Sequence, residues 1–343
     1  MLDRACFVPC MKRVIACRIM CFLFVFLAFG IAEAQQASWS PDRNIEIVIP
    51  AGAGGANDTT ARIVQQIFQK HGIVSRPIVA VNKPGGAGTI GLTYLSQFRG
   101  DAHYLLNAAI NVLTNYIIGR SKLRYSDFSP VALLHNEYLV TVVKADSPLK
   151  SGREMLRRLK ADPTSLSLAI GAAPGGTAHL AMALVAKANG IDVRTFRTVG
   201  FKSFAESVTA VMGGHVDGAF ILPAPALSGL ESGQLRIIGI TSRVRLSGDL
   251  ANIPTWKEQG GDVEFSASRF ILGAPGMTAA QIAYWDGAFA NLVNTEEWRR
   301  TLDKGRLVSN YLGSGDTTHY LQRLEIQLRG ALSDTGLVKR SAD

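Results

Sequence analysis

Cysteine is nearly absent from this chain of 343 residues. All four cysteines, Cys6, Cys10, Cys17 and Cys21, lie within the first 21 residues. A disulfide, a zinc site or a thiol nucleophile therefore depends on whether that segment stays in the mature protein. The hydrolase motifs G-x-S-x-G and H-E-x-x-H do not occur, and the six histidines show no metal-ligand spacing. We therefore expect no catalytic residue, no metal and no cofactor.

Long apolar runs are also scarce, and the run near the N-terminus has the features of a secretory leader. Lys12, Arg13 and Arg18 form a basic region before an apolar run at residues 19–31, and residues 32–34 (AEA) form a cleavage signal. We expect a signal peptide at residues 1–34. A membrane anchor is the alternative, but the run is shorter than the about 20 residues that span a bilayer. An exported chain without cysteine is typical of a bacterial periplasm.

Acidic residues are outnumbered, with 27 Asp and Glu against 36 Lys and Arg, so the net charge is +9. Such a balance suits nucleic acid, an acidic surface or a small anionic ligand. The sequence around Trp298, Arg299 and Arg300 has a basic character, but Glu296 and Glu297 interrupt it. This pattern favours a solvated face of mixed charge, and we expect no nucleic-acid partner.

Strand-like and helix-like segments alternate along the chain, and its length favours two domains. The strand-like runs cover residues 44–50, 77–82, 104–108, 139–144, 165–170, 216–221, 235–241 and 265–273. The helix-like runs cover residues 60–70, 90–98, 152–160, 177–188, 203–212, 278–293 and 317–333, the last with Asp316 as its expected N-cap. This order predicts an α/β fold with parallel strands.

The late helices indicate that the chain returns to its first lobe. We expect lobe I to consist of residues 35–136 and 262–343, and lobe II of residues 137–261. Two crossings between the lobes would form a hinge beside a central cleft.

Three glycine-rich turns lie between a predicted strand and a predicted helix: residues 50–58 (PAGAGGAND), 82–91 (NKPGGAGTIG) and 171–179 (GAAPGGTAH). Ligands of open α/β sheets bind at such junctions, where glycine allows close approach and the first helical N–H groups attract anions. Asn57 or Asp58 is an expected cap of the first helix, and Thr177 of the third. Plain turns with capped helices are the structural alternative. Three such turns together favour an anion site.

Two other interpretations of these turns are weaker. Residues 86–91 match G-x-G-x-x-G, but they follow the second strand of an exported chain, and neutral Asn111 stands about 20 residues beyond, so a dinucleotide is disfavoured. His179 lies in the first turn of a predicted helix, where a histidine is more often packed or solvated than catalytic. Lys202 and Arg269 are candidate cations for an anionic ligand, although most such side chains are only solvated.

The order and spacing of several short motifs resemble the substrate-binding receptors of tripartite tricarboxylate transporters, the Bug family. These motifs are residues 39–41 (WSP), 45–50, 54–58 (GGAND), 81–91, 128–131 (FSPV), 171–179, 213–216 (GGHV), 232–236 (SGQLR), 253–255 (IPT) and 274–276 (APG). The resemblance covers the chain from Trp39 to its end. It implies a periplasmic receptor with a two-lobe type II periplasmic-binding fold that closes around a small carboxylate without catalysis.

The resemblance also implies that the first two turns grip a carboxylate and that the turn in lobe II contacts the rest of the ligand. With the two candidate cations, the expected ligand-binding residues are Ala51, Gly52, Ala53, Asn57, Asp58, Ala87, Gly88, Thr89, Asn107, Ala109, Gly175, Gly176, Thr177, Lys202 and Arg269. The implied partners are a small carboxylate and the membrane subunits of a transporter or a sensor kinase, and we expect a monomer.

The chain departs from the family pattern at three places. Residues 200–203 (GFKS) stand where Pro-Tyr-Lys-Gly is common, Ile221 replaces a frequent acid, and Arg269 replaces a frequent aromatic residue. Loss of an acid and gain of a cation suit a di- or tricarboxylate better than an amino acid. Two alternatives stay open at this point: a periplasmic enzyme that uses His179 or Asp58, and a ligand-sensing partner of a membrane signalling protein.

Overall fold

The computed structural model describes residues 38–171 and 175–338. The residues from Ser40 onward form one compact unit, whereas the predicted leader, residues 1–34, lies outside the described residues. The strands are β1 (Ile45–Ile49), β2 (Ile78–Asn82), β3 (Tyr104–Ala109), β4 (Ser129–Tyr138), β5 (Val140–Lys144), β6 (Ser167–Gly171), β7 (Arg197–Phe201), β8 (Gly218–Ile221), β9 (Leu235–Ile240), β10 (Ser266–Gly273) and β11 (Val308–Leu312). The α-helices are α2 (Ala56–Lys70), α3 (Thr89–Ser96), α4 (Asn111–Ile117), α5 (Gly152–Ala161), α6 (Thr177–Ala188), α7 (Phe204–Met212), α8 (Leu227–Glu231), α9 (Ala279–Val293), α10 (Glu296–Gly305) and α11 (Ser314–Asp334).

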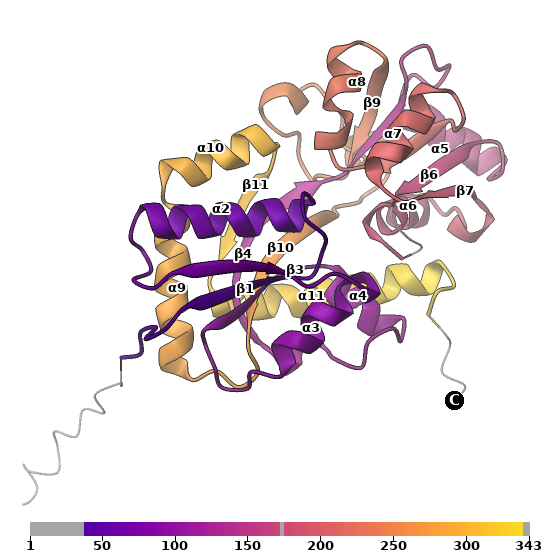
Figure 1. The fold of residues 1–343 in the computed structure, drawn as a ribbon. Helices are drawn as coiled ribbons and strands as arrows, with labels where there is room; N and C mark the ends of the chain where they lie inside the picture. Colours follow the sequence, from indigo (N-terminus) through magenta and orange to yellow (C-terminus); the bar gives the residue numbers. More distant parts are fainter. Residues whose placement is uncertain (1–37, 172–174, 339–343) are drawn as a thin grey trace, which may run out of the picture. The chain divides into compact units, whose positions relative to one another are not determined.

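The strands form two sheets, so the predicted α/β class is confirmed. The larger sheet has the order β11-β4-β10-β3-β1-β2, and the smaller one β7-β6-β8-β5-β9 (Figure 1). Strand β1 pairs in parallel with β2 and β3, and β6 with β7 and β8, as expected for strands joined through helices. The strands β10, β4, β11, β5 and β9 pair antiparallel, which the prediction of parallel strands missed.

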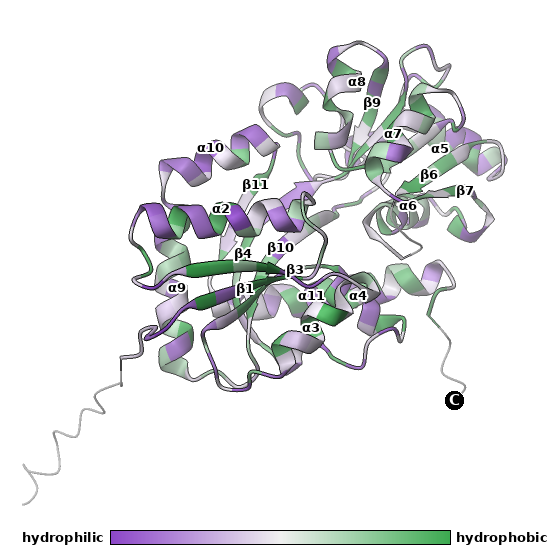
Figure 2. Cartoon of the chain, in the orientation of Figure 1, coloured by the Kyte–Doolittle hydropathy of each residue, from purple (hydrophilic) through white to green (hydrophobic). Residues whose placement is uncertain are grey.

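Helices cover both faces of the larger sheet. The helix α2 packs on β1, β2 and β3, while α3 and α11 pack on β3 and β4. The buried side of α2 includes Val64, Ile67 and Phe68, and the Phe68 ring lies 5.1 Å from that of Phe289 in α9. Figure 2 shows the hydrophobic colours on β1 and β3 and the hydrophilic ones on α10. Two-sided burial explains why these strands are apolar runs rather than alternating ones.

The chain passes from the larger to the smaller sheet through Leu139, and it returns through residues 241–265. The two passages are bonded to each other, because the Leu139 N–H donates to Thr241 Oγ1 and the Thr241 N–H donates to the Leu139 carbonyl, both at 2.9 Å. Thr241 Oγ1 also donates to the Phe265 carbonyl at 2.6 Å. The helix α11 contacts both β4 and α6, so it adds a third connection between the sheets.

Several local predictions were wrong or incomplete. The strands β7 and β11 and the helices α4, α8 and α10 were missed, because they are short or strongly polar. The ten-residue strand β4 was missed as well; it contains Pro130 and ends in polar residues. The expected N-caps Asn57, Asp58, Thr177 and Asp316 all lie inside their helices. The observed N-caps are Gly55, Gly176 and Gly313, none with a side-chain cap. The helices α2 and α11 therefore begin before their predicted ranges, whereas α6 begins at Thr177 as predicted. In all three, a glycine with extended backbone is the N-cap.

Candidate binding site

A cavity of about 460 Å³ lies where the loops after several strands meet. It is lined by Pro50, Ala51, Gly52, Ala56, Asn57, Pro84, Gly85, Ala87, Gly88, Ala109, Ile110, Asn111, Thr114, Asn115, Arg120, Gly175, Gly176, Thr177, Phe204 and Arg269. We call this cavity the glycine-turn pocket. It brings together all three glycine-rich turns, two from the larger sheet and one from the smaller.

The first turn is held in shape by Asp58, whose side chain faces the loop rather than the pocket. Its carboxylate accepts hydrogen bonds from the Gly54 N–H at 2.9 Å and from Arg62 Nε at 3.0 Å. Asn82 Nδ2 donates to both Asp58 Oδ1 at 2.9 Å and the Ala51 carbonyl at 3.0 Å, so the two turns are tied together. The hydrogen bond from Arg62 is the main cause that lowers the pKa of Asp58 to about 2. Asp58 is thus a structural carboxylate and a poor base.

The second turn has an unusual backbone. Gly85, Gly86, Ala87 and Gly88 all have positive φ, and Ala87, which has a Cβ, lies at φ 53° and ψ 35°. This conformation costs a non-glycine residue about 1–2 kcal/mol. The Ala87 carbonyl is fixed from α4 by Asn111 Nδ2 and Asn115 Nδ2, at 2.5 and 2.9 Å. The protein therefore holds a strained turn against the pocket, as is common at ligand sites.

The third turn includes residues 172–174, which lie outside the described residues. Gly175 has φ 80°, a backbone conformation that favours glycine. The Gly175 N–H donates to His179 Nδ1 at 3.0 Å. That nitrogen is therefore an acceptor without a proton, and burial lowers the pKa of His179. His179 therefore stabilises the turn by accepting this hydrogen bond.

The helices α2, α3 and α6 begin at this pocket with Gly55, Gly88 and Gly176 as N-caps, and none of the three has a side-chain cap. Helices α5, α7, α9 and α10 are instead capped by Ser or Thr side chains. At α11, Asp286 Oδ1 accepts from the Ser314 N–H at 2.7 Å. At the starts of α2 and α6 a bound anion can therefore accept from backbone N–H groups. At α3 the N–H groups of Gly88, Thr89 and Ile90 already donate to the carbonyls of Gly85 and Gly86.

The only charged side chains among the described residues that line the pocket are Arg120 and Arg269. Arg269 is 7% exposed and forms no ion pair with any described residue; Nη1 reaches the Ser268 carbonyl at 3.4 Å, and Nε has no partner. Burial lowers the pKa of this guanidinium, whereas the carboxyl group of Glu137 opposes that effect. A buried cation without a close counter-ion favours an anionic ligand.

The structure separates the predicted binding residues into two groups. Lining the pocket are Ala51, Gly52, Asn57, Ala87, Gly88, Ala109, Gly175, Gly176, Thr177 and Arg269. Not among its lining residues are Ala53, Asp58, Thr89, Asn107 and Lys202. Asn107 is fully buried and donates to the Asn57 carbonyl at 2.6 Å, so it positions the loop from behind. Lys202 is exposed beside the start of α7, where its N–H donates to Glu206 Oε2.

Sequence reasoning missed Asn111, Asn115, Arg120 and Phe204, which also line the pocket. Asn111 and Asn115 stand four residues apart directly after a strand, a spacing that places both amides on one helical face. That signal was available. Arg120 follows the helix in an ordinary polar loop, and nothing in the sequence distinguishes it from other arginines. Ile221, which replaces a frequent acid, is fully buried in β8 and does not line the pocket.

Two negative findings concern the described part of the chain. No group of three or more His, Cys, Asp or Glu side chains among residues 38–171 and 175–338 has the arrangement of a metal site. Over the same residues, no helix combines the length and the hydropathy that crossing a membrane requires.

The sequence profile described as "Tripartite tricarboxylate transporter family receptor" matches residues 60–332. The chain belongs to this family. As a member of a receptor family it is a solute-binding protein and not an enzyme, so the alternative of catalysis by His179 or Asp58 is discarded. The resemblance inferred from the sequence motifs is thereby confirmed.

Individual relatives agree with the family. A Cupriavidus necator protein named "UPF0065 protein in gbd 5'region" is 29% identical over 91% of this chain and 94% of its own length. Protein BugT of Bordetella pertussis is 28% identical over 77% of this chain and 81% of its own length.

Solved structures share the fold. A TctC solute binding protein from Polaromonas has a TM-score of 0.74 at 24% identity, over 85% of this chain and 99% of the other. The structure of R. palustris Rpa4515 with adipate has a TM-score of 0.74 at 19% identity, over 86% and 98%. At these identities the likeness concerns the fold, and the two-sheet periplasmic-binding architecture is confirmed.

Proposed function

We propose that this receptor binds a di- or tricarboxylate in the glycine-turn pocket. The observation that carries the proposal is the convergence of the uncapped starts of α2 and α6, and of the strained turn before α3, on one cavity that also holds the buried Arg269. Backbone N–H groups and a guanidinium are both donors to carboxylate oxygens. No acidic side chain stands among the described lining residues, so an ammonium group would lack a counter-charge there.

We expect residues of both sheets to contact the ligand, each sheet at a different part of it. The turns at residues 50–58 and 82–91 would hold one carboxylate, close to Ala87 and Gly88. Gly176 and Thr177 approach from the smaller sheet and would meet the rest of the ligand. The relative with adipate shows that a protein of this fold is found with a dicarboxylate.

Closure would use the passages between the sheets. The proposed lobes are residues 35–136 with 262–343, and residues 137–261, so Leu139 and Thr241 lie near the boundary. Ligand contacts made by both lobes only in the closed form would shift the population toward closure. Because α11 packs on α6, opening requires that helix contact to slide or separate.

The cellular setting follows from the same proposal. A leader at residues 1–34 would export the chain to the periplasm, where the mature receptor would act as a monomer and deliver its ligand to the membrane subunits of a tripartite transporter. Size-exclusion chromatography with light scattering tests the monomer, and N-terminal sequencing of the exported protein tests cleavage before Gln35.

Calorimetric titration of the mature protein with succinate, adipate, malate, citrate and glutamate tests the ligand class. We expect the strongest binding from a carboxylate without an ammonium group, together with a rise in melting temperature because the ligand binds only the folded state. Preference for glutamate, or no binding by any member of the panel, contradicts the proposal.

A further inference from the structure

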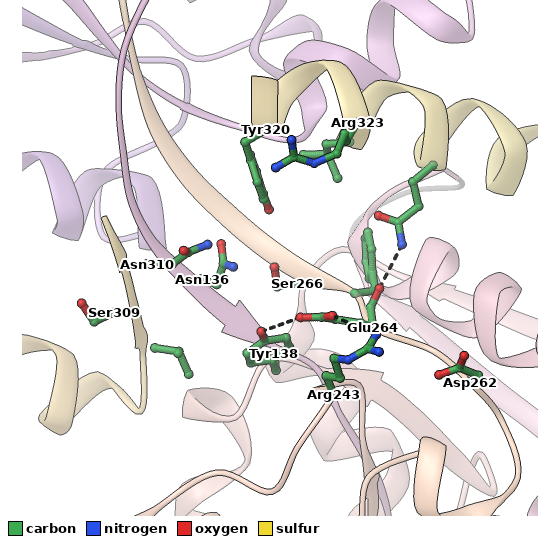
Figure 3. A pocket seen from close by; sticks show the side chains of 14 residues that line it. Asn136, Tyr138, Arg243, Asp262, Glu264, Ser266, Ser309, Asn310, Tyr320 and Arg323 are labelled. Carbon is green, nitrogen blue, oxygen red and sulfur yellow. Dashed lines mark hydrogen bonds and ion pairs between the residues drawn. The ribbon is translucent and has the colours of Figure 1, made fainter. Parts of the chain in front are cut away.

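A second cavity, of about 520 Å³, shares no lining residue with the glycine-turn pocket. Its walls are the end of β4, the strand β11, the helix α11 and the returning passage between the sheets (Figure 3). It is lined by Asn136, Tyr138, Arg243, Asp262, Glu264, Phe265, Ser266, Val308, Ser309, Asn310, Tyr320, Arg323, Leu324 and Gln327. We call it the passage pocket.

The polar side chains of the two pockets lie on opposite faces of the β10–β4 ladder. Side chains alternate along a strand, so His135 and Glu137 face one side with Arg269, while Asn136 and Tyr138 face the other with Ser266 and Ser268. The β10–β4 ladder agrees, since Arg269 is paired with His135 and Ser268 with Asn136. The passage pocket is therefore not an extension of the glycine-turn pocket.

Asn136 provides an unfilled acceptor in this pocket. Its side chain is only 6% exposed, yet Oδ1 has no hydrogen-bond partner among the described residues. A buried amide oxygen without a partner is destabilising, and such atoms in native proteins require an explanation. A donor group of a bound molecule would supply the missing hydrogen bond.

The pocket also carries charges of both signs. Tyr138 Oη donates to Glu264 Oε1 at 3.2 Å, and Arg243 approaches the Glu264 carboxylate at 4.0 Å, so these three side chains form one connected wall. Arg323, on α11, forms no ion pair with any residue in the described ranges. Figure 3 shows Arg323 and Tyr320 on a different wall from Glu264 and Arg243. One wall thus has an unpaired cation, and another has an acid beside the free acceptor.

We propose that the passage pocket is a second ligand site, which takes a small zwitterion of the α-amino acid type. The ammonium group would donate to Asn136 Oδ1 on the side of Glu264, and the carboxylate would pair with Arg323. A neutral molecule would leave Arg323 without a counter-ion, and a dicarboxylate would face Glu264 and Asp262. Charge complementarity therefore separates this site from the glycine-turn pocket, which has no acid.

The position of the pocket gives it a regulatory consequence, which rests on the proposed function. Tyr138 and Arg243 lie in the proposed lobe II, whereas Asn136, Glu264 and Arg323 lie in the proposed lobe I. Both lobe II side chains contact Glu264, so a molecule beside Glu264 would lie against both lobes. A molecule that contacts both lobes would bind more tightly at one degree of lobe closure than at another. It would then change the dicarboxylate affinity, and the dicarboxylate would change its affinity by the same factor.

The direct test is calorimetric titration of the mature protein with L-alanine, L-serine and L-glutamine, with propionate and alaninamide as single-charge analogues of L-alanine. We expect at least one amino acid to bind with a Kd below about 1 mM and each analogue to bind at least about tenfold more weakly. Arg323→Gln, an exposed substitution that leaves the core intact, should weaken amino-acid binding about tenfold or more. Arg329→Gln on the same helix, whose arginine pairs with Glu325, is the matched control and should change nothing.

Asn136→Leu should also weaken amino-acid binding, and its melting curve shows whether the variant is folded. No binding by the three amino acids up to about 10 mM overturns the site, in which case a water molecule is sufficient for Asn136. Amino-acid binding that is lost in Arg269→Gln but kept in Arg323→Gln also overturns it, because the ligand then occupies the glycine-turn pocket. Titration with the dicarboxylates is a separate measurement, so failure of one site does not imply failure of the other.

The regulatory part has its own readout. With the amino acid at saturation, the dicarboxylate Kd should change by about fivefold or more, and the reverse experiment should give the same factor. If each ligand had the same Kd with and without the other, the two sites would not be coupled, although the second site would still exist.

Discussion

Arg269 and Glu137 lie diagonally across the β10–β4 ladder on the same face of the sheet, both more than nine-tenths buried, yet they form no ion pair. Burial raises the pKa of Glu137 to about 7, although the charge of Arg269 opposes the shift. His135 lies on the same face, and burial, followed by the charge of Arg269, lowers its pKa to about 3. Near neutral pH, Glu137 is therefore the group of this cluster that changes its charge.

The first prediction is a pH-dependent affinity. When Glu137 is protonated, the positive charge of Arg269 is not offset and attracts the anion most strongly. As the pH rises from 6 to 8 through the pKa of about 7, Glu137 ionises and the affinity for a dicarboxylate should fall roughly three- to tenfold. Calorimetry at the two pH values measures this change. Further ionisation of the ligand over this range would raise the affinity with pH, so it cannot produce the expected fall.

Glu137→Gln is the matching control. Glutamine keeps the size of the side chain and removes its charge, so the affinity should stay high and nearly constant from pH 6 to 8. If the variant retained the full pH dependence, the charge change would belong to another group.

The second prediction concerns Arg269 itself. Arg269→Gln removes the buried guanidinium from the glycine-turn pocket and should weaken dicarboxylate binding by roughly 10- to 100-fold, the range of a hydrogen bond to a charged group. Lys202→Gln is the matched control, because Lys202 is exposed and does not line the pocket. Equal losses in both variants would point to a long-range effect of net charge instead of a contact.

The third prediction tests the strained turn. Asn115→Ala removes one of the two amides that hold the Ala87 carbonyl, so the turn should leave its positive-φ conformation more often and bind dicarboxylate about tenfold more weakly. Ala87→Gly in that background relieves the strain and should recover part of the loss. Asn294→Ala, which removes a similar amide bond to the Ala290 carbonyl away from the pocket, serves as the control. A double variant no better than Asn115→Ala would show that strain at Ala87 is not the cause.

The fourth prediction is about stability. The Asp58 pKa of about 2 lies below its value of 3.8 in an unfolded chain, so the carboxylate stabilises the fold above pH 4 and this contribution is lost as the pH falls toward 2. Asp58→Asn should lower the urea midpoint at pH 6, and the difference from the parent protein should shrink near pH 3. Asp146→Asn, an exposed acid paired with Lys144, should lower the midpoint little at either pH. If the urea midpoint of Asp58→Asn differed from that of the parent protein by the same amount at both pH values, the loss of stability would come from altered packing and not from the charge.

The glycine turns show how far sequence reasoning reaches at this site. A strand followed by clustered glycines and a helix is a local pattern, so the three turns were predicted without coordinates. The family resemblance implied Ala51, Gly88 and Gly176 within them, and the structure places all three on the pocket. The helix caps were predicted wrongly by local rules. Asp58 has the side chain of a cap, but the i,i+4 contact with Arg62 and the long-range contact with Asn82 direct its carboxylate into the turn.

The sequence by itself determined the family, the α/β class and the three turns, because these follow from short-range periodicity and from motifs that keep their order. Only the tertiary structure decided which charges face the ligand. Arg120 and Arg269 line one cavity, and Asn136 and Arg323 another, because strand pairing and helix packing join residues far apart in the chain. A pattern of neighbours along the sequence contains no information on which face of a strand a distant helix will cover.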